Sequence, residues 1–235
     1  MSPRMADQLI AQLVETRSDN DRANVLEELR RLILSGGAPP GIQIPPAEVA
    51  NAFGVSAIPV REALKTLVGE GLVVHQRNAG YRVSQLSTDE LREIYFVRGT
   101  LEQAALARAV ERIDDDGLNR ARERHHDLVT AVKYHDRKAF HDISREFHRE
   151  LTTPCGMPRL LNMFENTWNL TEPFQVMRAT GIDTQEALND DHAALLEGFA
   201  ARDVDSVLTV AQVHHRRLES AIIENAAELG VRHDD

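Results

Sequence analysis

Three histidines in the C-terminal part of the sequence have the residue type and the setting that a metal site needs. His148, His192 and His214 each lie on or beside the apolar face of a different predicted helix. Neutral imidazole is a good ligand for zinc, nickel or iron, and a helical bundle can bring ligands from several helices together. A histidine on an apolar face is also commonly a hydrogen-bonded core residue. The residues alone therefore leave two interpretations open, a divalent metal site or three separate core residues.

A second set of residues, nearer the N-terminus, has the chemistry for contacting DNA. Ser56 is a suitable N-cap for a short amphipathic helix. Arg61 lies on the outward side of that helix, where a guanidinium can bind guanine O6 and N7 together, and Lys65, one turn later, suits a phosphate. Arg77 and Asn78 lie in a predicted turn that can reach the DNA backbone or the neighbouring minor groove. These residues predict DNA binding, although helix-turn-helix geometry also occurs in proteins that bind no DNA.

The elements that must position this second set are short. Apolar residues at helical spacing predict a helix over 21–35. Pro45-Pro46 suits the first turn of a second helix, which Gly54 ends before a third, amphipathic helix begins. Two β-branched runs then flank residues 77–80, whose asparagine and glycine favour a hairpin turn. The order predicts a winged helix-turn-helix of three helices plus a β-hairpin.

The remainder of the chain has no strand signal. Turn residues divide it into predicted helices near 88–111, 114–133, 135–153, 157–178, 184–201 and 203–229. The predicted fold class is therefore mainly α, in which the winged helix-turn-helix is followed by an all-α antiparallel bundle of six or seven helices. The histidines would be contributed by three helices of this bundle.

Charge is distributed unevenly over the predicted domains. These are an N-terminal arm (1–20), a DNA-binding domain (21–86) and an all-helical effector-binding and dimerisation domain (87–235). The whole chain has a net charge of −10, but residues 21–86 carry +1 and residues 87–235 carry −10. The acidic balance therefore does not exclude DNA binding by the N-terminal module. Its small positive charge predicts a modest nonspecific affinity for DNA.

Composition excludes several classes of protein. The single cysteine, Cys155, excludes a disulfide framework and every cysteine-based zinc module. The N-terminal residues lack a long apolar stretch with a small-residue cleavage site, and no apolar run reaches the length of a membrane span. We expect a cytoplasmic bacterial protein with no membrane contact.

Dense motifs run from about residue 25 to 85. They are Leu34-Ser35-Gly36, Val49-Ala50, Phe53-Gly54-Val55-Ser56, Pro59-Val60-Arg61-Glu62-Ala63-Leu64 and Glu70-Gly71-Leu72-Val73. This set strongly resembles the DNA-binding domain of the GntR family of bacterial transcription regulators. In that family the start of the recognition helix, the arginine of the Pro-Val-Arg-Glu-Ala-Leu motif and the wing tip contact the operator. The DNA-binding residues that we predict on this basis are Ser56, Ala57, Ile58, Arg61, Lys65, Arg77, Asn78 and Gly80.

Two positions depart from the family pattern. Family members commonly have arginine where this chain has Ala57, and some relatives have arginine at the position of Ala47. Ala57 or Ile58 in the major groove can still contact a thymine methyl group. We therefore expect an operator that is related to the usual family half-site but differs from it.

Looser motifs follow over roughly 90 to 226. They are Val97-Arg98, Leu101-Glu102, Ala105, Phe147-His148, Leu151, Asp191-His192, Asp203 and His214. This set resembles the FCD ligand-binding domain of the FadR branch of GntR regulators. Many FCD domains bind a metal through an aspartate and three histidines, and the metal helps to hold a small carboxylate effector. The resemblance implies that His148, His192 and His214 bind zinc, nickel or a similar divalent metal, while His215 points about 100° away on its helix.

Ser144 occupies the position of the missing aspartate, one helical turn before His148. A serine hydroxyl is a weak, neutral ligand compared with a carboxylate. The site is therefore expected to bind metal more weakly, to use water in place of the aspartate, or to hold an anion directly through protonated histidines.

Arg98 matches the arginine of the family's first FCD helix and can pair with an effector carboxylate. A structural salt bridge with Glu102 or a neighbouring residue is the alternative. A small organic acid is the expected effector. The other predicted effector-binding residues are Tyr95, Glu102, Trp168, Asn169 and Arg178.

The favoured function is a ligand-responsive transcription regulator. Repression is the commoner mode in the family, so we expect a repressor. Its helical domain would form a homodimer, which binds a double-stranded DNA operator. Two alternatives are a metal-dependent hydrolase or oxidoreductase with a three-histidine site, and a constitutive DNA-binding dimer with a vestigial pocket. The enzyme alternative lacks a carboxylate placed as a general base on the same helix face. We therefore expect no enzymatic activity.

Overall fold

The computed structural model describes residues 9–13, 25–226 and 231. The chain forms two compact units that divide between Leu86 and Ser87, with Asn169–Phe174 belonging to the first unit. Most of the expected N-terminal arm, 1–20, lies outside the described residues.

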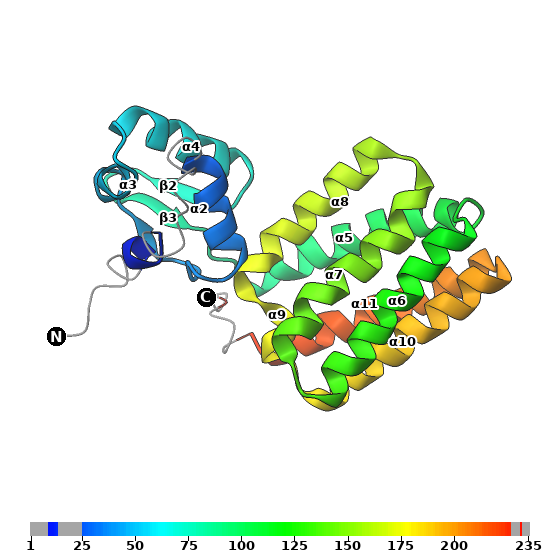
Figure 1. Cartoon of the computed structure of the whole chain (residues 1–235). Coiled ribbons are helices and arrows are strands. Elements are labelled where there is room, and N and C mark those ends of the chain that lie inside the picture. Colours follow the sequence, from blue (N-terminus) through cyan, green and yellow to red (C-terminus); the bar gives the residue numbers. More distant parts are fainter. Residues whose placement is uncertain (1–8, 14–24, 227–230, 232–235) are drawn as a thin grey trace. The chain divides into compact units, whose positions relative to one another are not determined.

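The first unit combines short helices with a small antiparallel sheet (Figure 1). Its elements are α2 (Val25–Leu34), β1 (Gln43–Ile44), α3 (Pro46–Phe53), α4 (Ala57–Gly69), β2 (Val73–Gln76) and β3 (Gly80–Val83). The strand order is β1-β3-β2, and the predicted hairpin is β2–β3. The sequence did not predict strand β1, because this strand has only two residues, which are too few to show an alternating pattern.

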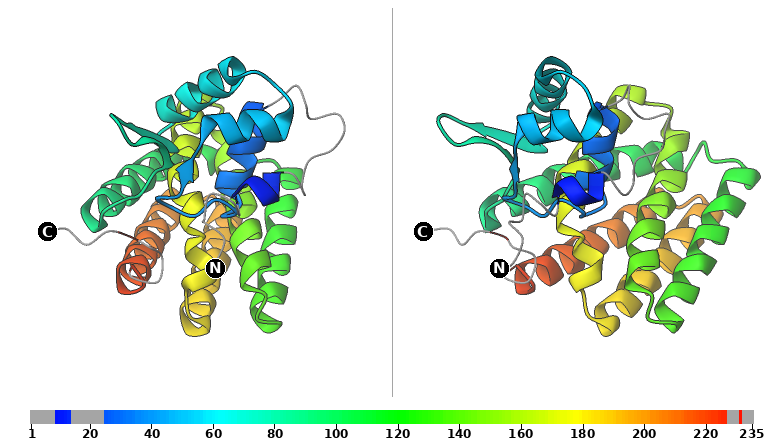
Figure 2. Two further views of the ribbon diagram at one scale, coloured as in Figure 1. Left: turned by 90° about the vertical axis from the view of Figure 1, so that its left-hand side faces the viewer. Right: turned by 60° about the vertical axis from the view of Figure 1, so that its left-hand side comes forward.

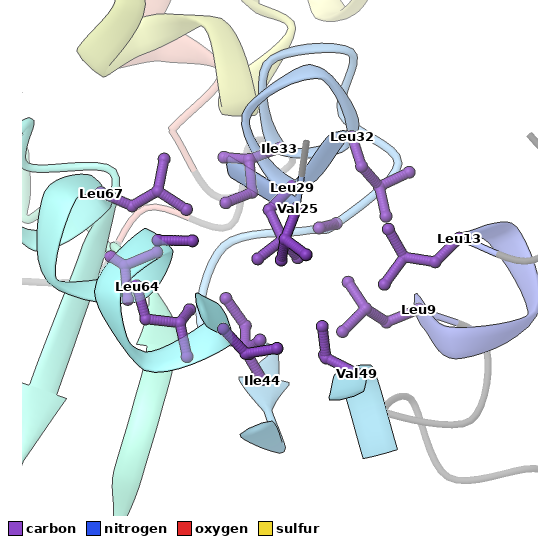
Figure 3. Packing of buried hydrophobic residues seen from close by; sticks show 14 of the residues in the cluster. Leu9, Leu13, Val25, Leu29, Leu32, Ile33, Ile44, Val49, Leu64 and Leu67 are labelled. Atoms are coloured by element: carbon purple, nitrogen blue, oxygen red, sulfur yellow. The ribbon is translucent and has the colours of Figure 1, made fainter. Parts of the chain in front are cut away.

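The core of this unit is formed by apolar residues at helical spacing (Figure 3). Leu29 of α2 and Leu64 of α4 are completely buried in it. Residues 9–13 are also helical, and Leu9 and Leu13 are buried in the same cluster. This part of the predicted arm therefore contributes to the core.

Two turns set the direction of the elements that the sequence predicts to contact DNA. Gly54 ends α3 with a φ of 66°, in the left-handed region that favours glycine, and joins it directly to α4. At the hairpin tip, Asn78 and Gly80 have φ values of 65° and 79°. Asparagine tolerates this conformation better than other non-glycine residues. Both turns lie where the sequence predicted them.

The second unit is helical. Its elements are α5 (Thr88–Ala109), α6 (Asp115–Lys133), α7 (Arg137–Thr152), most of α8 (Pro158–Thr171), α9 (Val176–Ala179), α10 (Ile182–Ala201) and α11 (Val204–Glu224). Helix α6 packs against α7 and α10, and α11 packs against α5 and α10 (Figure 2). Among the described helices, none has the length and apolar character needed to cross a membrane.

The single helix predicted over 157–178 is wrong. The chain instead forms α8, a 3-10 turn at Glu172–Phe174 and the short helix α9. Pro173 cannot donate a backbone hydrogen bond, and Gln175 has a φ of 48°, so neither residue continues an α-helix. The sequence pattern failed here because apolar residues continue at helical spacing across the break.

Candidate metal centre and nucleic-acid interface

Three helices bring the three predicted histidines together. His148 comes from α7, His192 from α10 and His214 from α11. The ring centroids of His148 lie 5.1 Å from those of both other histidines, which are 4.8 Å apart. One ring nitrogen from each residue lies within 4.8 Å of the other two. All three side chains are buried, so the cluster forms inside the helical unit.

His192 carries the clearest sign that the cluster fits a ligand. Both of its ring nitrogens are buried and neither has a hydrogen-bond partner. An unpaired buried polar atom costs free energy, and native proteins normally satisfy it. Three converging imidazoles are a suitable donor set for a divalent transition metal. The residues present therefore fit the metal that the sequence resemblance implied.

The protonation state of two of these histidines also suits a metal. Burial, reinforced by the neighbouring rings of His214 and His148, lowers the pKa of His192 well below its usual value. Burial likewise lowers the pKa of His214 to about 4, although Asp191 partly opposes this shift. Both rings are neutral at pH 7, which is the state that binds metals. This finding argues against an anion held by protonated His192 and His214.

Glu102 on α5 is a buried carboxylate that hydrogen bonds to two histidines. Its Oε1 lies 2.5 Å from Nδ1 of His148, and its Oε2 lies 2.6 Å from Nε2 of His215. Burial alone would raise the pKa of this carboxyl, but the two histidines more than offset burial and hold its pKa well below the usual range. Both carboxylate oxygens are engaged, and the Arg98–Glu102 salt bridge that the sequence left open is not formed.

A second carboxylate, that of Asp191, lies beside His214. Asp191 Oδ2 lies 3.0 Å from Nε of Arg217 and 3.5 Å from Nδ1 of His214. The contact with His214 is at the outer limit of a hydrogen bond, and we treat it as an electrostatic contact. Sequence reasoning missed both carboxylate contacts, because Glu102 and Asp191 approach their histidines from other helices.

Arg98 lies close to the histidine cluster in an aromatic setting. Its guanidinium carbon lies 4.1 Å from the centre of the Tyr95 ring and 4.4 Å from that of Trp168. Trp168 in turn lies 5.4 Å from the ring of His148. Arg98 is buried, and its Nε has no hydrogen-bond partner. The arrangement can hold the guanidinium by cation–π contact while leaving a charged N–H available to an anion.

The remaining predicted residues of this site are placed differently. Ser144 is buried one turn before His148. Asn169 is half-buried on α8 and belongs to the first compact unit. Arg178 is exposed, and its Nη1 donates to Oε1 of Gln175 at 3.2 Å.

The start of α4 is an exposed surface that combines apolar and basic side chains. Ser56 has the backbone conformation of an N-cap, but its side chain makes no capping hydrogen bond. Ile58 is 72% exposed, so its side chain is accessible to a partner. Arg61 is exposed and makes no ion pair within the described part of the chain, whereas Lys65 pairs with Glu62 at 2.8 Å. Ala57 is half-buried at the first position of the helix.

The hairpin tip carries the other predicted DNA contacts. Arg77 and Asn78 are exposed, and Gly80 begins strand β3. Next to the Gln76–Gly80 pair that closes the turn, the ring of His75 packs on that of Tyr81 with a centroid distance of 4.5 Å. The tip is therefore a projecting polar turn on a braced pair of strands.

Comparison with known proteins identifies both parts of the chain. Residues 93–217 match the family model described as FCD domain, and residues 22–83 match that of bacterial regulatory proteins, gntR family. The chain is 25% identical to the HTH-type transcriptional repressor RspR of Escherichia coli, over 83% of this chain and 85% of the relative. It is 26% identical to the repressor GlaR of the same species, over 79% of this chain and 88% of the relative.

A solved structure has the same fold. E. coli McbR/YncC superposes with a TM-score of 0.75 and 23% sequence identity, over 89% of this chain and all of that one. At this level of identity the likeness establishes the fold and leaves the ligand to be argued from the residues of this chain.

Proposed function

Because this chain belongs to the GntR family of bacterial DNA-binding transcription regulators and carries an FCD domain, we propose that it is a repressor controlled by a small organic acid. The observation that carries this proposal is the convergence of three buried histidines close to a buried arginine with an unpaired N–H. Two relatives, RspR and GlaR, are repressors by name, which supports the sign of regulation.

On the DNA side, the start of α4 enters the major groove. Arg61 is free to bind a guanine edge, and the exposed Ile58 can contact a thymine methyl group. Lys65 and the hairpin tip, with Arg77 and Asn78, bind phosphates or the adjacent minor groove. The free hydroxyl of Ser56, which does not cap its own helix, is available to a phosphate. A homodimer would place two such helices on a pseudo-palindromic operator.

On the effector side, His148, His192 and His214 hold a divalent metal such as zinc or nickel. A bound metal supplies a positive centre that coordinates a carboxylate oxygen. Arg98 supplies a second positive charge, held by Tyr95 and Trp168. The two positive groups favour a small carboxylate. Effector binding and operator binding must then influence each other by the same factor.

The alternatives from the sequence are less well supported. A metal-dependent enzyme needs an available general base, but both oxygens of the nearby Glu102 are engaged by histidines. Relatives over most of the chain are transcription regulators. A constitutive DNA-binding dimer with a vestigial pocket would not need the buried, unpaired nitrogens of His192.

The test is elemental analysis of protein purified without a nickel column, together with the His192→Ala variant. About one metal per chain, lost in the variant, is expected. Operator binding is then measured with a panel of small organic acids, and release of the DNA by one of them is expected. Absence of metal from a folded protein that still responds to an acid would remove the metal from the proposal. Absence of any response would favour the constitutive binder.

A further inference from the structure

Glu102 links the histidine cluster to a fourth histidine that is not part of it. One carboxylate oxygen contacts His148, whose ring faces the cluster, and the other contacts His215. The Glu102 side chain is almost completely buried, with 1% of the residue exposed. A carboxylate this deeply buried is costly unless its partners define its position. The contact with His148 is therefore a fixed feature of the core.

The direction of this hydrogen bond determines which nitrogen of His148 is available. An ionised carboxylate only accepts hydrogen bonds, so Nδ1 of His148 must carry the proton. With Nδ1 engaged by Glu102, Nε2 is the ring nitrogen that can bind a metal. Metal-binding histidines commonly donate their second N–H to a carboxylate, which fixes the ring orientation and makes the other nitrogen a better ligand. Glu102 gives His148 this arrangement.

His215 helps to hold the other end of the carboxylate. A Cβ atom at Gly99 would lie 3.2 Å from Cγ of His215, so this ring packs directly on the backbone of α5. Gly99 and Glu102 lie three residues apart on that helix, on neighbouring positions of one face. The absence of a side chain at Gly99 lets His215 reach Glu102. His215 thus braces the carboxylate through the oxygen that His148 does not contact.

Ser144 makes this carboxylate more important. The position one turn before His148 contributes no negative charge, so a metal held by the three imidazoles would lack an anionic ligand. Glu102 is an acidic side chain whose oxygen directly contacts one of the three histidines at hydrogen-bond distance. Only the imidazole ring of His148 would separate the negative charge of Glu102 from a bound metal.

We propose that Glu102 is the positioning residue of the metal centre, orienting His148 so that Nε2 binds the metal and supplying the negative charge that Ser144 does not. His215 braces Glu102 and does not bind the metal. The inference rests on the proposed three-histidine metal site.

The experiment compares zinc affinity in the purified full-length wild type and Glu102→Gln, measured by competition with a chromophoric chelator. The glutamine variant keeps the size of the side chain but removes its charge. We expect the variant to bind zinc about 10- to 100-fold more weakly. Cobalt-loaded protein provides a second readout, because a change in the orientation of His148 alters the visible absorption bands of the metal. An unchanged zinc affinity and an unchanged cobalt spectrum would overturn the proposal.

Two controls separate positioning from other effects. His215→Gln removes the bracing ring and should weaken zinc binding by well under tenfold, whereas loss as large as in His148→Gln would make His215 a ligand and overturn the assignment. Glu146→Gln, on the exposed side of α7, should leave zinc affinity unchanged.

Folding and the metal site itself are tested separately. Thermal unfolding of the metal-free variants shows whether Glu102→Gln remains folded. If Glu102→Gln does not fold, Glu102→Asp is measured in its place, because aspartate keeps the charge but shortens the side chain. We expect Glu102→Asp to bind zinc several-fold more weakly than the wild type. A zinc affinity equal to that of the wild type would contradict the proposal. Failure of the wild type to bind zinc would overturn both the metal site and the role of Glu102, whereas wild-type binding with unaffected Glu102 variants would overturn only the latter.

Discussion

Individual side chains in the histidine cluster are held in defined protonation states by their surroundings. Burial keeps His192 and His214 neutral, while two hydrogen-bonded histidines keep Glu102 ionised in the same core. The cluster therefore combines neutral ligands with one nearby negative charge. Neither property can be read from residue type, because both depend on burial and on contacts between helices.

The lowered pKa of His214 predicts a pH dependence of stability. The folded pKa of about 4 is below the ordinary value of 6.5, so the unfolded chain binds the proton more readily. The stabilising effect of the neutral ring is complete above pH 6.5 and is lost as the pH falls to about 4. The loss is of the order of 3 kcal/mol. Urea unfolding of metal-free protein between pH 7.5 and 4.5 measures it.

The matched control for this measurement is His214→Gln, which has no titrating ring at this position. Its stability should fall less steeply over the same pH range than that of the wild type. Equal slopes for the two proteins would show that the pKa of His214 is not lowered in the folded state.

The exposed Ile58 predicts a contact with a thymine methyl group. In an operator obtained by selection, replacing the contacted thymine by uracil removes one methyl group, worth about 0.8 kcal/mol or roughly a fourfold loss of affinity. The wild type should show this loss and Ile58→Ala should not. Gel-shift titration gives the affinities. Val68→Ala, at an exposed residue near the other end of α4, should behave like the wild type. If no uracil substitution lowers the operator affinity of the wild type, the predicted contact between Ile58 and a thymine methyl group is wrong.

At the scale of elements, helix α5 carries much of the site on one face. Tyr95, Arg98 and Glu102 are spaced by three and four residues, and all three are buried. The helix begins with a capping box, in which the Ser87 hydroxyl accepts from the backbone N–H of Glu90 and the Glu90 carboxylate accepts from that of Ser87. The start of the helix, two turns before Tyr95, is therefore well defined.

Two N-cap serines predict opposite effects of the same substitution. Ser87→Ala removes a side-chain cap and should lower the free energy of unfolding by about 1 kcal/mol, with little effect on operator affinity. Ser56→Ala removes a hydroxyl that makes no capping bond, so it should leave stability nearly unchanged and weaken operator binding. Urea unfolding and gel-shift titration on both variants measure the two effects. The same stability loss in both would contradict the assignment of Ser56 to DNA contact.

At the scale of the whole molecule, regulation requires the effector site and the DNA-binding unit to be coupled. The residues proposed for DNA binding and for metal binding belong to different compact units, so we expect that mutations can separate the two functions. DNA contacts are predicted in α4 and the hairpin, whereas the proposed metal ligands and Arg98 belong to the helical unit.

Arg98→Gln tests this separation. The variant should keep the operator affinity of the wild type in the absence of effector, because Arg98 is remote in sequence and function from the DNA contacts. It should lose at least tenfold in sensitivity to the acid that releases the wild type most strongly, since a charge-assisted hydrogen bond is lost. Gel-shift titration with that acid measures both quantities. Unchanged sensitivity would place the effector carboxylate elsewhere.

Much of the fold could be predicted from local patterns in the sequence. Apolar spacing and turn residues predicted the helix-turn-helix, the hairpin and most helices, because these features depend on residues close together in the chain. Local sequence patterns did not predict the secondary structure where contacts distant in sequence or backbone geometry determined it. Strand β1 exists only through its pairing with β3, and the break after α8 depends on backbone geometry at Pro173 and Gln175.

The same distinction applies to the histidine site. The sequence by itself determined the family, the three candidate histidines and Arg98, since residue type and spacing carry these signals. Only the tertiary structure decided that Glu102 pairs with His148 and His215, that Arg98 packs on Tyr95 and Trp168, and that Arg178 stays at the surface. These contacts join residues up to 113 positions apart. They arise from how the helices pack, and burial then sets the charge of each group.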